Sequence, residues 1–369
     1  MRLGMFMMPV HPAGRPMQET LAEDIAKSIL ADQLGFDEVW MGEHFSATTE
    51  PFPSPLMFLA ALVPQTKNIQ LGTAVINLPN HHPAIVAAEA AQFDHLSGGR
   101  FLFGVGSGGL APDFELFDLF DGPSRQRKFL EALDFILKIW AQDPPYDLKG
   151  DFWTVGLKKV IVPELGFGEM PKPLQKPHPP VHVSIGSPDS PTARVAAQRG
   201  FGIISGPTAP AWSIASQWKA YAEACEAAGR RPDGDNWRVS RNVVVAPTDA
   251  EARERAYSPE GSNRHYFAYM RQALFLGRRL FMIKPDPAMS DEACTPEAVM
   301  DECLIHGSPR TVIDKLVAYR ERVGPFGALI KIGVDWGGPN EAWDRETMRL
   351  LAHEVMPKFR QHVMAQAAE

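Results

Sequence analysis

The sequence predicts an α/β fold, a single (β/α)8 TIM barrel that carries insertions after its fourth and seventh strands. Three observations support this prediction. Short apolar runs alternate with longer segments of helical periodicity, as βαβ units require. Eight such runs occur, and each is followed by a helix or an insertion. Glycine or polar residues stand at nearly every carboxyl end of these runs, which is where a barrel assembles its site.

The alternative architecture is a doubly wound parallel sheet, which also alternates strands and helices. Its dinucleotide-binding form has a Gly-x-Gly-x-x-Gly turn after the first strand, and no such turn follows residues 3–8. The pattern occurs only from Gly104 onward, where an irregular stretch instead of a helix comes next. The barrel is therefore favoured, with residues 1–369 in one domain.

The predicted strands are short runs rich in aliphatic and aromatic residues, bounded by glycine, proline or polar residues. The first run contains Met5, Phe6, Met7 and Met8, and Pro9 ends it. In order, the expected strands are residues 3–8, 38–41, 69–76, 101–105, 181–185, 202–204, 238–245 and 328–334.

The predicted helices place apolar residues on one face and end at glycine or proline signals. In residues 19–34, Ile25, Ile29 and Leu30 share a face, and Gly35 ends the helix. Residues 83–96 are rich in alanine and run into a Ser-Gly-Gly stop. The other expected helices are residues 55–63, 124–140, 191–199, 211–228, 309–322 and 341–359.

Three excursions interrupt the alternation. Residues 107–122 are irregular behind a glycine-rich loop, and residues 141–180 contain many prolines and glycines. Residues 254–302 mix aromatic and basic side chains, and Pro285 and Pro287 break any helix there. Because residues 110–122 and 254–302 would lie beside the carboxyl ends of the strands, we expect them to form a lid.

Composition excludes several classes of function. The chain has 37 basic and 44 acidic residues and a net charge of −7, which disfavours a nucleic-acid partner. It contains no apolar run of about 18 residues, so no membrane span is expected. The three cysteines show neither metal-knuckle nor redox spacing, which fits a reduced, cytoplasmic setting.

His44 is the candidate acid or base. It follows Glu43 at the end of the second predicted strand, where a barrel directs side chains toward its ligand. Imidazole exchanges protons near neutrality because its ordinary pKa is about 6.5. The alternative is a histidine that only hydrogen-bonds the neighbouring backbone.

Several other strand ends could hold a ligand. Small residues at Thr73 and Ala74 would let a flat ring lie close to the backbone, or they would serve close strand–helix packing. The loop at Gly106 and Gly108 is flexible and rich in amide donors. Hydroxyl groups and free amides precede the helix at 191–199, which suits a phosphate, although Ser190 could simply cap that helix.

Other chemistry finds little support in the sequence. Adjacent His81 and His82 rarely point the same way, and His82-Pro83 more plausibly begins a helix than a metal site, so no metal is expected. No nucleophile elbow, Walker loop, kinase signature or His-Glu-x-x-His motif occurs. A bound cofactor is therefore expected to supply the reactivity.

Residues 68–118 resemble the bacterial luciferase-like, flavin-dependent monooxygenases. The stretches Leu-Gly-Thr-Ala-Val, Leu-Pro-Asn-His-His-Pro, Leu-Ser-Gly-Gly-Arg-Phe and Phe-Gly-Val-Gly-Ser-Gly occur in the order and spacing of that family. Glu43-His44 fits its acid–histidine pair after the second strand. Residues 183–200 resemble the diketocamphane monooxygenase branch more closely than the luciferases.

The resemblance implies roles for individual residues. His44 falls on the histidine at the reactive edge of the flavin. Thr73, Ala74 and Val75 fall on the strand beneath the isoalloxazine ring, with a cis peptide expected between Ala74 and Val75. The loop at Gly106 and Gly108 also falls at the implied cofactor site. Ser187, Ser190 and Thr192 fall on the segment that binds the phosphate, and Arg125 matches an arginine directed at that phosphate. Where luciferases have a cysteine and an arginine, this chain has Gly106 and Ser107, so light emission is not implied.

The resemblance also implies an activity. The chain would be a two-component monooxygenase that takes reduced FMN (FMNH2) from a separate flavin reductase and reacts with O2. Through a C4a-peroxyflavin it would oxygenate an apolar organic substrate, by Baeyer–Villiger oxidation of a cyclic ketone or by hydroxylation. Family members are commonly homodimers through their early helices.

Three other functions stay open at this point. The same fold serves deazaflavin-dependent hydride-transfer enzymes, which need no O2. A non-catalytic flavin-binding protein would hold FMN without turnover. An aldolase or isomerase would need a Schiff-base lysine, and Lys331, inside the eighth predicted strand, is equally suited to a salt-linked core role.

Overall fold

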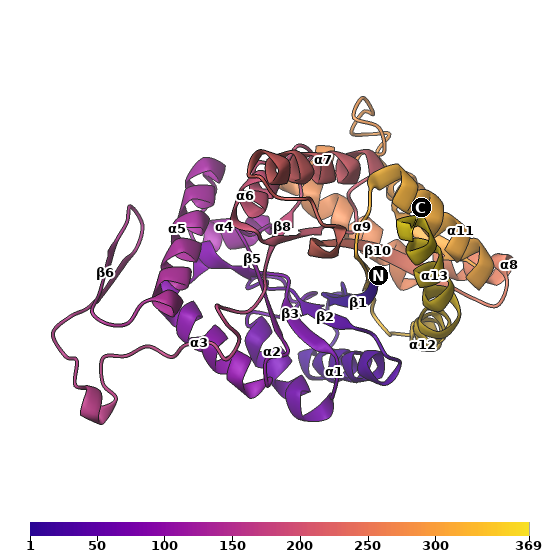
Figure 1. The fold of residues 1–369 in the computed structure, drawn as a ribbon. Coiled ribbons are helices and arrows are strands. Elements are labelled where there is room, and N and C mark those ends of the chain that lie inside the picture. Colours follow the sequence, from indigo (N-terminus) through magenta and orange to yellow (C-terminus); the bar gives the residue numbers. More distant parts are fainter. Residues whose placement is uncertain (369) are drawn as a thin grey trace.

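The computed structural model describes residues 1–368, and eight parallel strands in it close into a barrel (Figure 1). Strand β12 pairs with both β1 and β10, which completes the ring and confirms the predicted fold class. In order around the barrel the strands are β1 (Arg2–Met7), β2 (Glu38–Met41), β3 (Gln70–Thr73), β5 (Phe101–Gly106), β8 (Val181–Ile185), β9 (Gly202–Ser205), β10 (Trp237–Val245) and β12 (Ala328–Ile332).

Helices surround this ring in chain order (Figure 1). Within residues 1–368, four of the nine helices of this layer begin at a proline, which lacks the amide hydrogen that a first helical turn leaves unbonded. The nine helices are α1 (Met17–Gln33), α2 (Pro55–Leu62), α3 (Pro83–Leu96), α5 (Gly122–Ala141), α6 (Pro191–Arg199), α7 (Ala211–Ala227), α11 (Pro309–Val323), α12 (Asn340–Leu350) and α13 (Met356–Ala368).

Side chains from alternate strands fill the barrel interior. Trp40, Leu102, Ile204 and Ile330 come from β2, β5, β9 and β12 and form one apolar cluster. Four residues from every second strand are the usual layer of such a barrel. Gly72 on β3 makes room for the indole, because a Cβ there would lie 2.4 Å from the ring of Trp40.

The excursion after β5 contains a helix that the sequence did not reveal. Residues 111–116 form α4 (Ala111–Leu116), so the expectation of an irregular stretch through Gly122 was wrong in this part. Its six residues are too few to show a helical period. The excursion between α5 and β8 carries an antiparallel hairpin, β6 (Tyr146–Lys149) and β7 (Thr154–Leu157), which stands out from the barrel (Figure 1).

The excursion after β10 is more regular than its composition suggested. It contains α8 (Asp249–Tyr257), α9 (Ser262–Leu276) and α10 (Pro296–Cys303), followed by a strand that the sequence did not predict, β11 (Leu304–Gly307). Residues 304–307 pair in parallel with residues 242–245, the second half of β10. A four-residue strand directly behind a helix offers no alternation to detect.

The third predicted strand is shorter than expected. β3 ends at Thr73, and a two-residue strand β4 (Ile76–Asn77) pairs with β5. The Ala74–Val75 peptide bond between them is cis, as the family resemblance implied.

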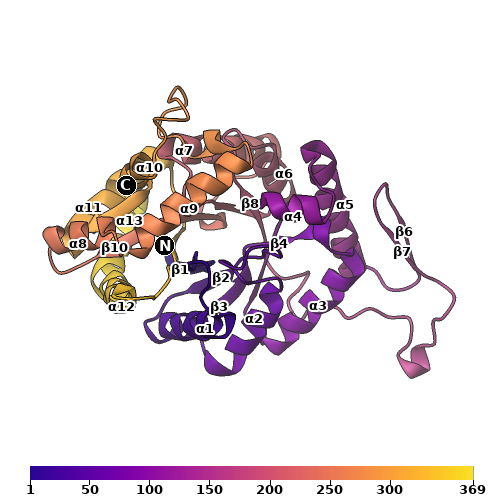
Figure 2. The same cartoon turned by 180° about the vertical axis from the view of Figure 1, so that it is seen from behind.

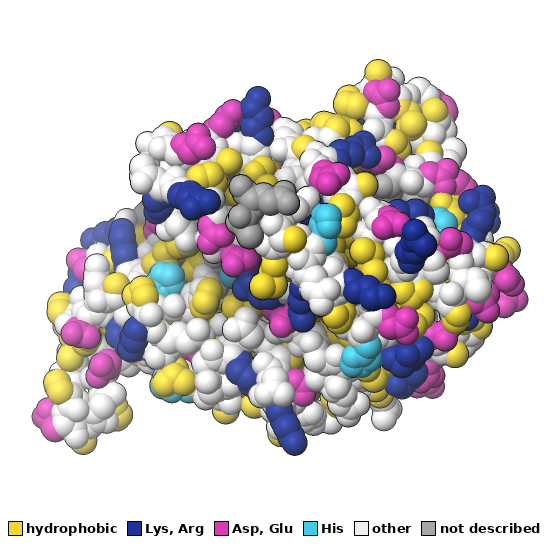
Figure 3. Space-filling view, turned by 45° about the vertical axis from the view of Figure 1, so that its right-hand side comes forward, with side chains coloured by type: hydrophobic (Ala, Val, Ile, Leu, Met, Phe, Trp, Pro, Cys, Tyr) yellow, Lys and Arg dark blue, Asp and Glu magenta, His cyan; other side chains and the backbone are white. Residues whose placement is uncertain are grey.

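The described part of the face shown in Figure 3 carries no patch of charge of a single sign. Within residues 1–368, no helix has both the length and the apolar character that crossing a bilayer requires. Basic and acidic side chains intermingle on the face shown in Figure 3. A surface of that kind presents no single-sign field to a polyanion.

Candidate active site

Helices α4 and α9 lie over the barrel on the side seen in Figure 2. The loop after β2 is hydrogen-bonded to both helices, and the loop after β5 lies against Phe114 of α4. In a (β/α)8 barrel the carboxyl ends of the strands form the site. Every site residue predicted from the sequence follows one of those strands or begins α5 or α6.

His44 is anchored from two sides. Its Nδ1 lies 2.9 Å from Oε2 of Glu50, and its backbone N–H donates to the carbonyl of Phe52 at 3.0 Å. The imidazole is 19% exposed, whereas the Glu50 side chain is 5% exposed. No described residue bonds Nε2, so this nitrogen is available to a ligand at the barrel mouth.

Glu50 connects His44 to the insertion after β10. The hydroxyl of Tyr269, on α9, donates to the same Glu50 oxygen at 3.1 Å. Burial raises the pKa of Tyr269, and the negative charge of Glu50 raises it further, so this phenol remains a donor. The contact couples the β2 loop to α9.

Glu43 does not pair with His44. Its carboxylate is buried, lies within hydrogen-bond distance of the His81 ring, and accepts the backbone N–H of Asn77 at 2.6 Å. Burial raises the pKa of Glu43, against the opposing effect of His81. The two adjacent residues of the Glu43-His44 motif therefore have separate partners, His81 for Glu43 and Glu50 for His44.

Asp113 fixes the loop that carries His44. This buried carboxylate on α4 accepts the backbone N–H groups of Phe45 at 3.2 Å and Ser46 at 3.0 Å, and also the Ser46 hydroxyl. The ring of Phe45 packs edge-on against Phe117 with centroids 5.0 Å apart. The short helix after β5 thus holds the catalytic candidate in place.

The strands under the site pack closely. The Thr73 hydroxyl donates to the carbonyl of Gly104 at 2.7 Å and accepts the N–H of the same residue at 3.0 Å. Thr73 is fully buried, and its hydroxyl joins β3 to β5, which is a contact between two strands and not the strand–helix packing considered from the sequence. Val75 lies against Gly106, where a Cβ would come within 2.6 Å of a Val75 methyl group.

Two residues expected at the cofactor, Arg125 and Gly108, lie beside Phe114 on α4. The Arg125 guanidinium lies 3.9 Å from the centroid of the Phe114 ring, and a Cβ at Gly108 would lie 3.4 Å from that ring. Gly108 has φ +87°, a conformation that glycine adopts readily. The side chain of Gln126, next to Arg125, donates to the Thr192 hydroxyl at 3.2 Å.

Ser187 and Ser190, also expected at the phosphate, lie around the start of α6. Ser190 is buried and caps the helix, since its side chain accepts the N–H of Ala193 at 3.4 Å. The carbonyl of Ser187 accepts from Gln217 at 3.3 Å. Ser190 therefore fulfils the capping role left open by the sequence, while the Ser187 and Thr192 hydroxyls stay near the helix start.

Arg279, which the sequence analysis missed, also lies beside Phe114. Its guanidinium lies 5.5 Å from the Phe114 centroid and donates to the carbonyl of Gly109. The Nε atoms of Arg125 and Arg279 are both buried and lack a partner among the described residues. An anion such as a phosphate would fit these donors.

The histidines considered as metal ligands are otherwise engaged. His81 pairs with Glu43, whereas the His82 ring accepts the N–H of Ala84 at 3.3 Å and caps α3. The adjacent rings therefore have separate partners, and His82 begins a helix as expected.

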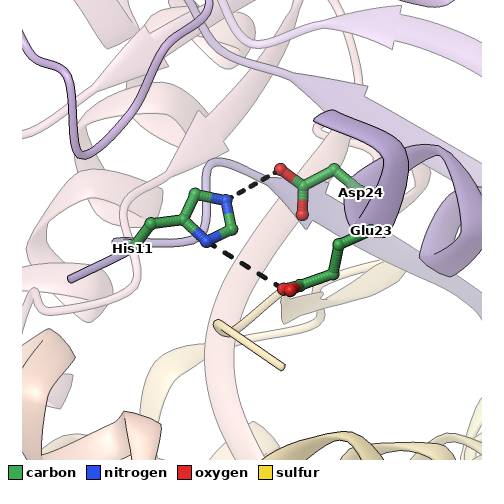
Figure 4. A group of neighbouring side chains, drawn as sticks. All are labelled: His11, Glu23 and Asp24. Atoms are coloured by element: carbon green, nitrogen blue, oxygen red, sulfur yellow. Dashed lines mark hydrogen bonds and ion pairs between the residues drawn. The ribbon is translucent and has the colours of Figure 1, made fainter. Parts of the chain in front are cut away.

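One cluster elsewhere has the spacing of metal ligands: His11, Glu23 and Asp24 (Figure 4). The imidazole lies 3.0 Å from Asp24 and 2.7 Å from Asp335. Lys27 lies 3.2 Å from Asp24 and 3.6 Å from Glu23. Because cationic side chains of the protein already contact these carboxylates, the cluster is a network of internal ion pairs.

Lys331 does not serve the mouth of the barrel. Its ammonium group lies 2.6 Å from Asp344 on α12 and donates to the carbonyl of Ile332 at 2.9 Å. Burial lowers the pKa of Lys331, and the charge of Asp344 opposes that effect. This is the salt-linked core role that the sequence left open, so the structure offers no support for a Schiff-base enzyme at this lysine.

Comparison with known proteins decides the family. The profile described as luciferase-like monooxygenase matches residues 1–324. The chain belongs to the luciferase-like monooxygenase family. It is accordingly an enzyme and a flavin-dependent monooxygenase, as the resemblance of residues 68–118 implied.

Individual relatives in this family cover nearly the whole chain. The 4-hydroxyprotoasukamycin monooxygenase of Streptomyces nodosus subsp. asukaensis is 30% identical over 366 residues, 96% of this chain and 91% of that protein. The oxygenase component of the flavin-dependent trigonelline monooxygenase of Acinetobacter baylyi is 26% identical and covers 97% of this chain and 96% of its own length.

A solved structure confirms both the fold and the expected branch. The oxygenating constituent of 3,6-diketocamphane monooxygenase from Pseudomonas putida, a type II Baeyer–Villiger monooxygenase in complex with FMN, superposes with a TM-score of 0.85. It is 27% identical, and the match covers 97% of this chain and 98% of that one.

Proposed function

We propose that this monooxygenase uses reduced FMN, supplied by a separate flavin reductase, and O2 to oxygenate an apolar organic substrate. The observation that carries the proposal is His44, a partly exposed imidazole whose Nδ1 is tied to buried Glu50 while Nε2 stays available at the mouth of the barrel. Bound reduced FMN would supply the electrons that activate O2.

Different residues of the chain would bind the flavin ring, bind its phosphate and transfer the proton. The backbone at Thr73, Ala74 and Val75 would lie beneath the flavin ring, with Gly106 allowing close approach. Gly108, Arg125, Ser187 and Thr192 would bind the phosphate, and Ser190 would fix the helix start beside it. His44 Nε2 would donate or accept a proton at the reacting oxygen.

Helices α4 and α9 would exclude water from this site. Asp113 and Tyr269 already connect them to the loop of His44 and Glu50. Water exclusion matters because reduced flavin that meets O2 in contact with solvent is oxidised while the O2 is reduced to hydrogen peroxide, and no substrate is oxygenated.

Exposed apolar side chains on the helices that cover the site support the proposal of an apolar substrate. Five exposed apolar side chains lie on or beside α4 and α9, which cover the mouth: Leu116, Phe120, Phe275, Leu276 and Phe281. Exposed apolar groups of this kind are typical of surfaces that meet apolar ligands. Baeyer–Villiger oxidation of a cyclic ketone is the reaction favoured here, because the structural relative from P. putida is named for that chemistry.

A separate reductase is supported by the A. baylyi relative, whose name identifies it as an oxygenase component. We also propose a homodimer through α2 and α3, where Met57 is 75% and Ile85 is 54% exposed. Light scattering on the purified chain would test the dimer. A monomer at micromolar concentration would contradict it.

The test of the activity is anaerobic titration with reduced FMN, followed by mixing with O2 in the presence of a bicyclic ketone or a cyclic terpene. We expect reduced FMN to bind and the ketone to yield a lactone with an added oxygen atom. A hydroxylated terpene with no lactone would favour hydroxylation. Absence of reduced-FMN binding would contradict the proposal as a whole.

A further inference from the structure

Two arginines from distant parts of the chain share one aromatic ring. Arg125 begins α5, and Arg279 follows α9 in the insertion after β10. Their guanidinium carbons lie 3.9 Å and 5.5 Å from the centroid of Phe114 on α4. Three segments therefore converge at this point.

The charge of this pair is poorly compensated. Among the described residues, neither guanidinium forms a salt bridge with a carboxylate within 4.0 Å; Arg125 donates to the carbonyl of Leu119, and the charge of Asp121 offsets only part of the effect of burial, which lowers the pKa of Arg125. Burial lowers the pKa of Arg279, and the positive charge of Arg125 lowers it further. Both Nε atoms are buried without a hydrogen-bond partner. Such donors are costly when unpaired, and an anion would satisfy both at once.

The position of Arg279 places it beside the residues proposed for the phosphate. It donates to the carbonyl of Gly109, the residue after Gly108. Met282, three residues on, approaches Gly186, where a Cβ would lie 2.6 Å from its terminal methyl group. The segment after α9 thus reaches both glycine-containing loops, after β5 and after β8.

We propose that Arg125 and Arg279 together bind the flavin phosphate, and that Arg279 thereby couples closure of the 254–302 insertion to recognition of a phosphorylated flavin. This inference rests on the proposed use of FMN. Ser107 stands where luciferases have an arginine, so Arg279 would supply the second guanidinium from another part of the fold. Two arginines can each offer paired N–H donors to one phosphate.

The experiment compares two ligands that differ only in the phosphate. Dissociation constants for oxidised FMN and for riboflavin are measured by fluorescence quenching for the wild type, Arg279→Ala, Arg279→Lys and Arg278→Ala. Arg278 is the matched control, because it is exposed and adjacent and carries the same charge.

We expect Arg279→Ala to weaken FMN binding about 10-fold or more and to leave riboflavin binding unchanged. Arg279→Lys should recover part of the loss, and Arg278→Ala should change neither ligand. Limited proteolysis adds a readout of closure: FMN, but not riboflavin, should slow cleavage within residues 277–293 of the wild type, and the protection should disappear in Arg279→Ala.

Two other outcomes would overturn the inference. Equal weakening of FMN and riboflavin in Arg279→Ala would indicate a general effect on the pocket, and unchanged FMN binding would remove Arg279 from the phosphate site. Failure of the wild type to bind either flavin, oxidised or reduced, would instead contradict the proposed function itself, so the two failures are distinguishable.

Discussion

Nδ1 of His44 lies 2.9 Å from Oε2 of Glu50, and this contact leaves Nε2 as the ring nitrogen without a partner among the described residues. A carboxylate at Nδ1 holds the imidazole in one orientation and favours a hydrogen on that nitrogen. Nε2 is then the atom that can exchange a proton with a reacting group. Because Glu50 also contacts Tyr269, the orientation depends on α9 being in place.

His44→Ala should uncouple flavin oxidation from product formation. General acid–base groups of this kind contribute roughly 10²- to 10⁴-fold, so the yield of oxygenated product per reduced FMN should fall sharply while hydrogen peroxide rises. Product and peroxide are measured together after single turnover. His353→Ala, an exposed histidine at the junction of α12 and α13, is the control. Unchanged coupling in His44→Ala would contradict the assigned role.

Glu50→Gln should act through His44 and not on binding. The amide keeps the shape of the side chain but loses the charge that orients Nδ1, so turnover should drop at least about 10-fold. KM for the organic substrate and the dissociation constant for FMN should stay unchanged. Tyr269→Phe removes one donor to Glu50 and should have a smaller effect in the same direction. A rise in KM with constant turnover would indicate a substrate contact instead.

The strands of the barrel could be predicted because each one carries its own local signal. An apolar run such as Val181–Ile185 between loops rich in proline and glycine is readable without knowing its neighbours. β11 was missed because its four residues pair only with the second half of β10 and follow α10 without a loop. α9 was missed because aromatic and basic residues mix along it and because Pro285 and Pro287 made the surrounding segment resemble an irregular excursion.

The candidate site also contains residues with a local signal in the sequence and residues without one. The cis Ala74–Val75 bond could be predicted because it lies within a motif that resembles the family, whereas the roles of His44 and Arg125 stay predictions of the same kind. The residues that hold the loop of His44 could not be predicted. Asp113 lies 68 positions from Phe45, and Tyr269 lies 219 positions from Glu50. Only the closed barrel brings these residues together, so a single sequence holds no local signal for them.

The His11 network should make stability depend on pH. Burial alone would lower the pKa of His11, but hydrogen bonds to Asp24 and Asp335 raise it from 6.5 to about 9. The protonated imidazole therefore stabilises the fold fully below pH 6.5, and this contribution is lost as the pH rises through 9. Its full size is about 3 kcal/mol.

The measurement for His11 is the free energy of unfolding of the wild type and of His11→Gln between pH 5 and 10. The difference should be largest near pH 6 and should shrink above pH 9. Burial raises the pKa of Asp335, but His11 and Arg15 lower it to about 2, so the contribution of this carboxylate is present above pH 4 and lost as the pH falls toward 2. A difference independent of pH would contradict the ionic character of the network.

Removal of divalent metal should leave the fold unchanged. His11, Glu23 and Asp24 have the spacing of metal ligands, yet Lys27 and Arg15 already contact the carboxylates. Dialysis against EDTA should shift Tm by less than about 1 °C, and added Zn2+ should not raise it. Stabilisation by Zn2+ that His11→Gln abolishes would show a metal site at this cluster.

Gly104→Ala should destabilise the barrel strongly. A Cβ at Gly104 would lie 1.6 Å from the carbonyl oxygen of Thr73 on the neighbouring strand, and a backbone atom cannot move aside as a flexible side chain can. The two hydrogen bonds between Gly104 and the Thr73 hydroxyl would also be disturbed. The expected loss is about 3 kcal/mol or more in the free energy of unfolding.

The matched control for Gly104 is Gly156→Ala on the outlying hairpin. A Cβ at Gly156 would meet no atom within 4 Å, so the change should stay within about 0.5 kcal/mol. Both variants add the same methyl group to a strand, and urea denaturation measures both on one scale. Because Thr73 immediately precedes the Ala74–Val75 segment proposed to lie beneath the flavin, any folded Gly104→Ala protein should also bind FMN more weakly. Equal stability of the two variants would show that β3 and β5 can separate without cost.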